Sequence, residues 1–79
     1  MRKTLLKDKS FPVLLEKDED GVYIAECPVF SGCYSQGRSI DQALKKIRDV
    51  ISLCLEEKDN LERAKNYSPA DIRLYAVRI

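Results

Sequence analysis

The chain has 79 residues, of which 44% are hydrophobic and 34% charged, and this balance excludes the low-hydrophobicity, high-charge composition of disordered proteins. The formal net charge of +1 gives no support to nucleic-acid binding through a basic surface. The length fits a single domain, residues 1–79, whose thin core leads us to expect self-association as a dimer or tetramer.

The first predicted element is a β-hairpin. Residues Phe11–Lys17 alternate in polarity and are rich in strand-forming residues. Asp18–Gly21 ends in an Asp-Gly pair, which is a strong hairpin signal because glycine accepts a positive φ. The return strand is Val22–Cys27, and we expect Leu15 to pair with Ile24 because this register unites the more apolar faces.

A short third strand and a long helix follow the hairpin. Pro28 tends to end the second strand because it has no amide to donate, and Cys33–Gln36 is expected to be the third strand. Ser39 and Gln42 have the S-x-x-Q spacing of a capping box, so a helix is predicted to begin at this serine. Its apolar periodicity continues to about Lys58.

The predicted helix has one apolar stripe. Its members recur at steps of three and four, and they are Ile40, Ala43, Leu44, Ile47, Val50, Ile51, Cys54 and Leu55. A stripe of this kind must cover a sheet face, whereas the charged opposite side is typical of a helix that faces solvent.

The last part of the chain contains a connector and a final predicted strand. The connector runs from Asp59 to Tyr67, with a possible short helical extension, and Ser68-Pro69 then breaks any helix. Ile72–Ile79 has apolar residues at both parities, as expected when a strand is covered on two sides or lies at a subunit contact. The fold class is therefore α+β, with a three-strand meander, one long helix packed on one sheet face and a C-terminal strand, in the order β-β-β-α-β.

Residues for catalysis or metal binding are scarce. The chain has no histidine, the usual general acid or base, so the common catalytic triads are excluded, and we expect neither an enzyme nor a cofactor. The three cysteines, Cys27, Cys33 and Cys54, are too few to close a structural zinc site and are expected to be buried small hydrophobes in a reducing cytoplasm. No apolar run is long enough to span a membrane.

Two weaker functional interpretations stay open. Asp18, Glu19, Asp20 and Glu26 are oxygen donors of the kind that hold Mg²⁺ in a nuclease, but carboxylates of a tight turn diverge. Tyrosines on the predicted strands, among them Tyr34, are residues on which single-stranded RNA bases stack, but basic residues are not interleaved with them.

Three motifs together resemble the HicB antitoxin family. They are FPVLLEKDEDGVYIAECP from Phe11 to Pro28, SGCYSQG from Ser31 to Gly37, and the capped helix SIDQALKKIRDVISLCLE. The resemblance implies a partial RNase H-like fold without the nuclease active site, and an oligomer that neutralises HicA, a small mRNA-cleaving ribonuclease. Many family members carry a DNA-binding extension, and this chain ends at Ile79, so we expect no direct DNA binding.

The predicted partner-binding residues are Asp18, Glu19 and Asp20 at the hairpin tip, with Tyr34 and Gln36 on the third strand. The carboxylates are candidates to pair with the cations that a basic ribonuclease uses to hold RNA phosphates. The alternative is a homo-oligomeric protein-interaction module of the same family that has no toxin.

Overall fold

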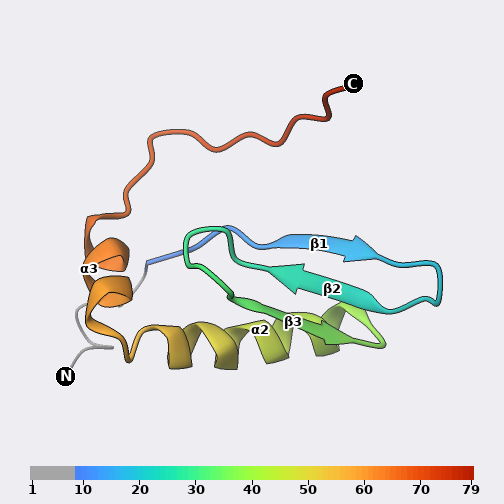
Figure 1. Ribbon diagram of the computed structural model, residues 1–79, viewed down its shortest axis with the longest axis horizontal. Helices are drawn as coiled ribbons and strands as arrows, with labels where there is room; N and C mark the ends of the chain where they lie inside the picture. The colour runs from blue at the N-terminus through green and yellow to red at the C-terminus, as the bar shows by residue number, and fades with distance from the viewer. Residues whose placement is uncertain (1–8) are drawn as a thin grey trace.

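The computed structural model describes residues 9–79 and contains a three-stranded sheet followed by two helices (Figure 1). The elements in chain order are β1 (Leu14–Lys17), β2 (Tyr23–Glu26), β3 (Tyr34–Gly37), α2 (Ile40–Cys54) and α3 (Lys58–Asn66). Each strand is antiparallel to the next, and the spatial order of the sheet is β1-β2-β3. The predicted α+β class, with a meander that leads into a long helix, is confirmed.

The register of the hairpin differs from the prediction. Leu15 pairs with Ala25, and Ile24 pairs with Glu16, so the predicted pairing of Leu15 with Ile24 is wrong. The physical reason is the polarity of the return strand, because Ile24 shares a face with Glu26 and burying that face would bury a carboxylate. Ala25 faces the core instead and is completely buried.

Helix α2 begins at the predicted cap. The hydroxyl of Ser39 accepts a hydrogen bond from the amide of Gln42 at 3.1 Å, and the Gln42 side chain accepts one from the amide of Arg38 at 2.6 Å. The helix ends at Cys54, earlier than predicted, and a turn separates it from α3. The side-chain amide of Asn60 donates to the carbonyl of Cys54 at 2.9 Å and holds this turn.

The core lies between α2 and one face of the sheet. Its fully buried members come from β2, the loop after it and both helices, and they are Ala25, Cys27, Phe30, Cys33, Ala43, Ile47 and Ala64. Helix and sheet touch at β3, where the Ser35 hydroxyl donates to the Ala43 carbonyl at 3.0 Å. Two residues of the predicted stripe, Ile40 and Leu44, are not buried against the sheet and stay exposed by 45% and 41%.

Helix α3 closes one end of the core. Phe11 contacts Phe30 and Tyr67 with ring centroids 5.4 and 5.6 Å apart, which ties the start of the sheet to the end of the helix. The ammonium of Lys9 donates to two carbonyls at the C-terminal end of α3, at 2.8 and 2.7 Å. A cation at this position satisfies carbonyls that the helix leaves free.

The predicted final strand, Ile72–Ile79, is not confirmed. After Tyr67 the chain leaves α3 and runs back on the β1 side of the sheet without joining it, and residues 70–79 are all exposed (Figure 1). Neither α2 nor α3, the helices of the described region, has the length and hydrophobicity needed to cross a membrane.

Candidate protein-binding surface

The sheet face opposite α2 is free of covering elements in the described part of the chain. We call it the outer face, and the register assigns it the side chains of Leu14, Glu16, Ile24, Glu26, Tyr34 and Gln36. Two of these six residues are acidic and none is basic. The outer face therefore combines apolar and acidic side chains, with no basic side chain among them.

The hairpin turn is held by one of its own carboxylates. Oδ1 of Asp18 accepts hydrogen bonds from the amides of Asp20 and Val22, both at 2.9 Å. Gly21 completes the turn with a φ of 81°, as its place in the predicted turn requires. Asp18, one of the predicted contacts, thus has a structural role that accounts for it without a partner.

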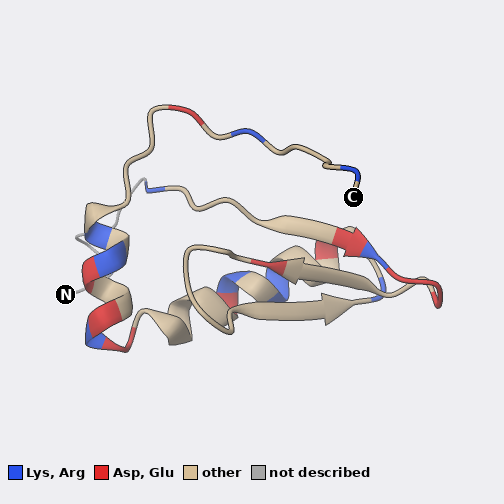
Figure 2. Cartoon of the chain, turned by 45° about the horizontal axis from the view of Figure 1, so that its top comes forward, with Lys and Arg blue, Asp and Glu red and all other residues tan. Residues whose placement is uncertain are grey.

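Glu19 and Asp20 form the exposed tip beyond that turn. The charge-coloured view shows the tip as an acidic projection at the end of the sheet away from α3 (Figure 2). Both residues are exposed. The turn uses the backbone amide of Asp20 and not its carboxylate, so the Asp20 side chain faces solvent beside that of Glu19.

The two predicted contacts on β3 both lie on the outer face. Tyr34 is 64% exposed and sits opposite Glu26, at the end of the sheet away from the tip. Gln36 sits opposite Ile24, nearer the tip, and lines a polar cleft of about 270 Å³ with Arg38 and Lys46. The fold thus brings Gln36 towards the acidic tip and leaves Tyr34 farther along the same face.

Four members of the outer face are missing from the contacts predicted by sequence, namely Leu14, Glu16, Ile24 and Glu26. The predicted register places Ile24 in the core, and neither Glu16 nor Glu26 is among the predicted partner-binding residues. The alternation of side chains along a strand could have identified them. Ile24 and Glu26 are two residues apart, so their side chains must lie on the same face of the strand. Ile24 is 37% exposed between the two carboxylates.

The cysteines gather on the core side of the sheet, as predicted. Cys27 and Cys33 are fully buried, Cys54 is half-buried, and all three are free thiols. Burial raises the pKa of the Cys27 thiol, and it raises the pKa of Cys33 to about 12 with a further contribution from the neighbouring Cys54. Residues 9–79 contain no group of three or more His, Cys, Asp or Glu side chains placed to hold a metal.

A family model described as the HicB_like antitoxin of bacterial toxin-antitoxin systems matches residues 11–76. The chain belongs to this family. The match begins before β1 and includes α3, so it covers both the outer face and the core behind it.

Curated relatives of the chain are UPF0150 proteins. One from Synechocystis is 54% identical over 52 residues, which is 66% of this chain and 75% of the relative. One from Archaeoglobus fulgidus is 40% identical over the same shares of each chain. One from Thermoplasma acidophilum is 31% identical over 67 residues, which is 84% of this chain and 97% of the relative. No solved structure matched the chain.

Proposed function

We propose that this chain is a non-catalytic antitoxin that binds and neutralises a small HicA-like, mRNA-cleaving ribonuclease in the cytoplasm, and that it does so as a dimer or tetramer. The observation that carries the proposal is the match of the HicB-like antitoxin model to residues 11–76. The chemistry of the outer face and of the hairpin tip supports a partner that is basic.

Charge favours a basic ribonuclease as that partner. A nuclease holds RNA phosphates with Lys and Arg side chains, and carboxylates of a second protein pair with the same cations. Glu19 and Asp20 at the tip, with Glu16 and Glu26 on the outer face, supply four such carboxylates. Complementary charge of this kind speeds association and excludes RNA from the occupied surface.

Apolar contact on the outer face supplies the rest of the binding surface. Tyr34 and Ile24 are both exposed there, on neighbouring strands, with Glu26 beside them. Aromatic side chains dominate the binding free energy of most interfaces, whereas charges at the rim mainly set the association rate. We therefore assign Tyr34 the anchor role and the tip carboxylates the steering role.

The proposal is tested by co-expression with the small basic reading frame next to the gene. Expression of that protein alone is expected to arrest growth, and simultaneous expression of this chain is expected to restore it. Growth arrest that persists in the presence of this chain, produced at a comparable level, rejects neutralisation. If the neighbouring protein is harmless and nothing co-purifies, the toxin-free interaction module replaces the antitoxin proposal.

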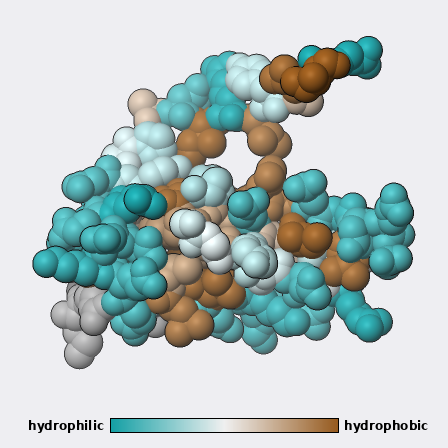
Figure 3. Space-filling model, in the orientation of Figure 1, coloured by the Kyte–Doolittle hydropathy of each residue, from teal (hydrophilic) through white to brown (hydrophobic). Residues whose placement is uncertain are grey.

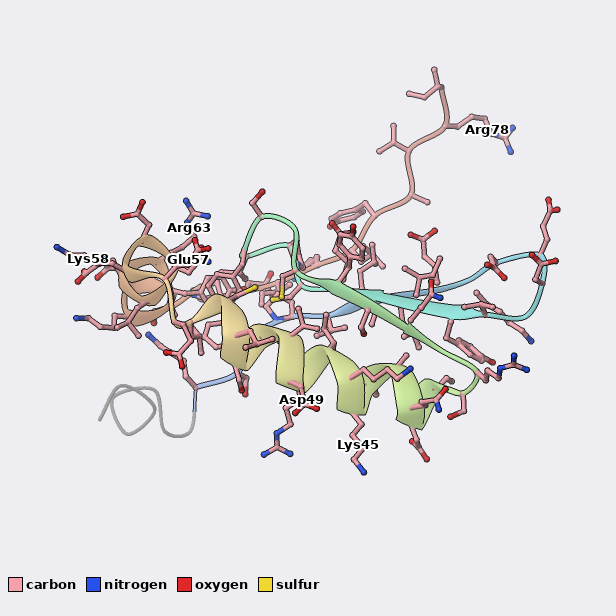
Figure 4. All side chains as sticks on the ribbon, turned by 60° about the horizontal axis from the view of Figure 1, so that its bottom comes forward. Lys45, Asp49, Glu57, Lys58, Arg63 and Arg78 are labelled. Atoms are coloured by element: carbon pink, nitrogen blue, oxygen red, sulfur yellow. The ribbon has the colours of Figure 1, made fainter. Side chains whose placement is uncertain are left out.

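Charge-reversal variants test the contact residues in the same assay. Glu19→Lys with Asp20→Lys leaves the turn-forming Asp18 intact, and we expect it to weaken protection and slow association with the toxin. The matched control is Asp49→Lys with Glu62→Lys, which changes the net charge by the same amount. Asp49 points away from the sheet on α2, and Glu62 makes one exposed ion pair with Lys65 on α3 (Figure 4). Equal protection by both variants rules the tip out as a contact.

A further inference from the structure

The segment from Ile72 to Ile79 is an exposed apolar stretch of chain. Leu74, Tyr75 and Val77 are exposed by 80%, 75% and 78%, and the space-filling view shows apolar atoms of this segment standing clear of the body (Figure 3). Contiguous exposed apolar residues of this kind mark an interaction surface in a folded protein. Strand formers at both parities suit the segment for pairing in a sheet.

Strand β1 offers a free edge to such a segment. In the described part of the chain β1 pairs with β2 on one side and with no strand on the other. The opposite edge of the sheet, at β3, lies along α2, and the Ser35 hydroxyl bonds the Ala43 carbonyl there. The unpaired amides and carbonyls of β1 are therefore the place where this sheet can accept another strand.

The segment does not fill this edge within its own chain. An open cleft of about 390 Å³ separates it from the start of β1, and its lining is largely apolar, from Pro12, Val13, Leu14, Pro28, Ile72 and Leu74, with Arg73 as its one charged member. The connection is short and stiff, because Tyr67 packs against Phe11 and Pro69 restricts the residue before it. Short, restrained hinges of this kind favour exchange of the following segment between copies.

Charge identifies a second copy as the occupant. The segment carries two basic residues and no acidic one: Arg78 has its charge to offer, and Arg73 also pairs with Asp71, just before the segment, at 2.8 Å. The outer face beside β1 carries Glu16 and Glu26 and no basic residue. A basic ribonuclease would be repelled by the segment but not by the outer face. Since donor segment and acceptor edge are on the same chain, two copies related by a twofold axis satisfy both at once.

We propose that residues 72–79 of one copy add as a fourth strand to the β1 edge of a second copy, and that the second copy does the same in return. The exchange covers the apolar cleft and closes the free edge of each sheet. It deepens the proposed self-association by naming its surface, but it does not depend on a toxin. The antitoxin role is unaffected if the exchange proves wrong.

The test is the mass of the full chain in solution, measured by light scattering. The wild-type chain is expected at twice its 9.1 kDa. Leu74→Glu is expected to raise the dimer dissociation constant by about tenfold or more, because an acidic charge replaces an apolar side chain at a pairing surface that already carries carboxylates. Leu53→Glu is the matched control, since Leu53 on α2 is 71% exposed and lies outside the segment, and it should remain dimeric.

A second variant and a second readout separate strand pairing from general stickiness. Tyr75→Pro removes a backbone amide from the segment without adding charge, and it is also expected to give a monomer. Amides of β1 and of residues 72–79 should be protected from hydrogen exchange in the dimer and lose that protection in both variants. A monomeric wild-type chain, or dimers of unchanged affinity for Leu74→Glu and Tyr75→Pro, overturns the proposal.

Discussion

At Gly37, β3 and the first turn of α2 approach each other closely. A Cβ atom at this position would lie 2.7 Å from the backbone nitrogen of Ala43 and 3.1 Å from Gln42. Both neighbours belong to the first turn of α2 and move only if the helix moves. We predict that Gly37→Ala lowers the free energy of unfolding by about 1–3 kcal/mol, as overpacking does in other cores, measured by chemical denaturation.

Gly21 is the control for Gly37, because glycine is favoured there by the backbone conformation and not by a close neighbouring atom. Gly21 has a φ of 81°, and a Cβ atom added there would meet no other atom within 4 Å. Gly21→Asn should therefore change the unfolding free energy by less than about 0.5 kcal/mol, because asparagine tolerates this conformation. An alanine at position 37 that is as harmless as this asparagine contradicts the close contact.

The buried thiol of Cys33 makes stability depend on pH. Its pKa is raised from 9.0 to about 12, so the unfolded chain loses this proton first as the pH rises. The stabilisation is fully present below pH 9 and is lost between about pH 9 and 12, at up to about 1.4 kcal/mol per pH unit. Denaturation of the wild-type chain and of Cys33→Ala across this range should show a shallower decline for the variant.

The comparison with Cys33→Ala isolates the thiol, because the two proteins share every other titratable group. The remaining Cys27, whose pKa is also raised by burial, should keep part of the decline in the variant. Parallel curves for the two proteins would mean that Cys33 is not held neutral by the core.

Residue-level chemistry was predictable where it is local. The Ser39 cap and the glycine of the hairpin turn follow from short motifs, and both are confirmed. The sheet face that Ile24 occupies was predicted wrongly. Hydrophobicity alone favours pairing Ile24 with Leu15, but Glu26 lies on the same face as Ile24 and would then be buried as well. The outer face could therefore not be assembled correctly from the sequence.

At the level of the elements, α2 depends on its N-cap. The Ser39 hydroxyl satisfies an amide of the first turn, and we predict that Ser39→Ala lowers the unfolding free energy by about 1 kcal/mol. Ser52→Ala is the matched control, because its hydroxyl bonds the Arg48 carbonyl within the helix and satisfies no free amide. Equal losses for the two variants, measured by chemical denaturation, would show that the cap contributes nothing of its own.

The boundaries of the later elements were harder to predict. The apolar period continues past Cys54, so it gave no sign that α2 ends there and that α3 begins at Lys58. At the break, the Cys54 carbonyl accepts the Glu57 amide and the Asn60 side chain, and contacts of this kind have no periodic signature in the sequence. The segment Ile72–Ile79 has the sequence of a strand, but within the described residues 9–79 of the single chain it pairs with no other strand.

The whole molecule presents two surfaces of different character. The outer face and hairpin tip are acidic with apolar residues between the charges, whereas the C-terminal segment is apolar and basic. We assign the first to the toxin and the second to another copy of the chain.

The most direct test of the antitoxin proposal is a titration of this chain into its purified ribonuclease partner, with cleavage of labelled RNA as the readout. Cleavage should fall in proportion to the chain added and stop at a fixed molar ratio, while the chain alone leaves the RNA intact. Undiminished cleavage in a large molar excess of folded chain would contradict the proposal.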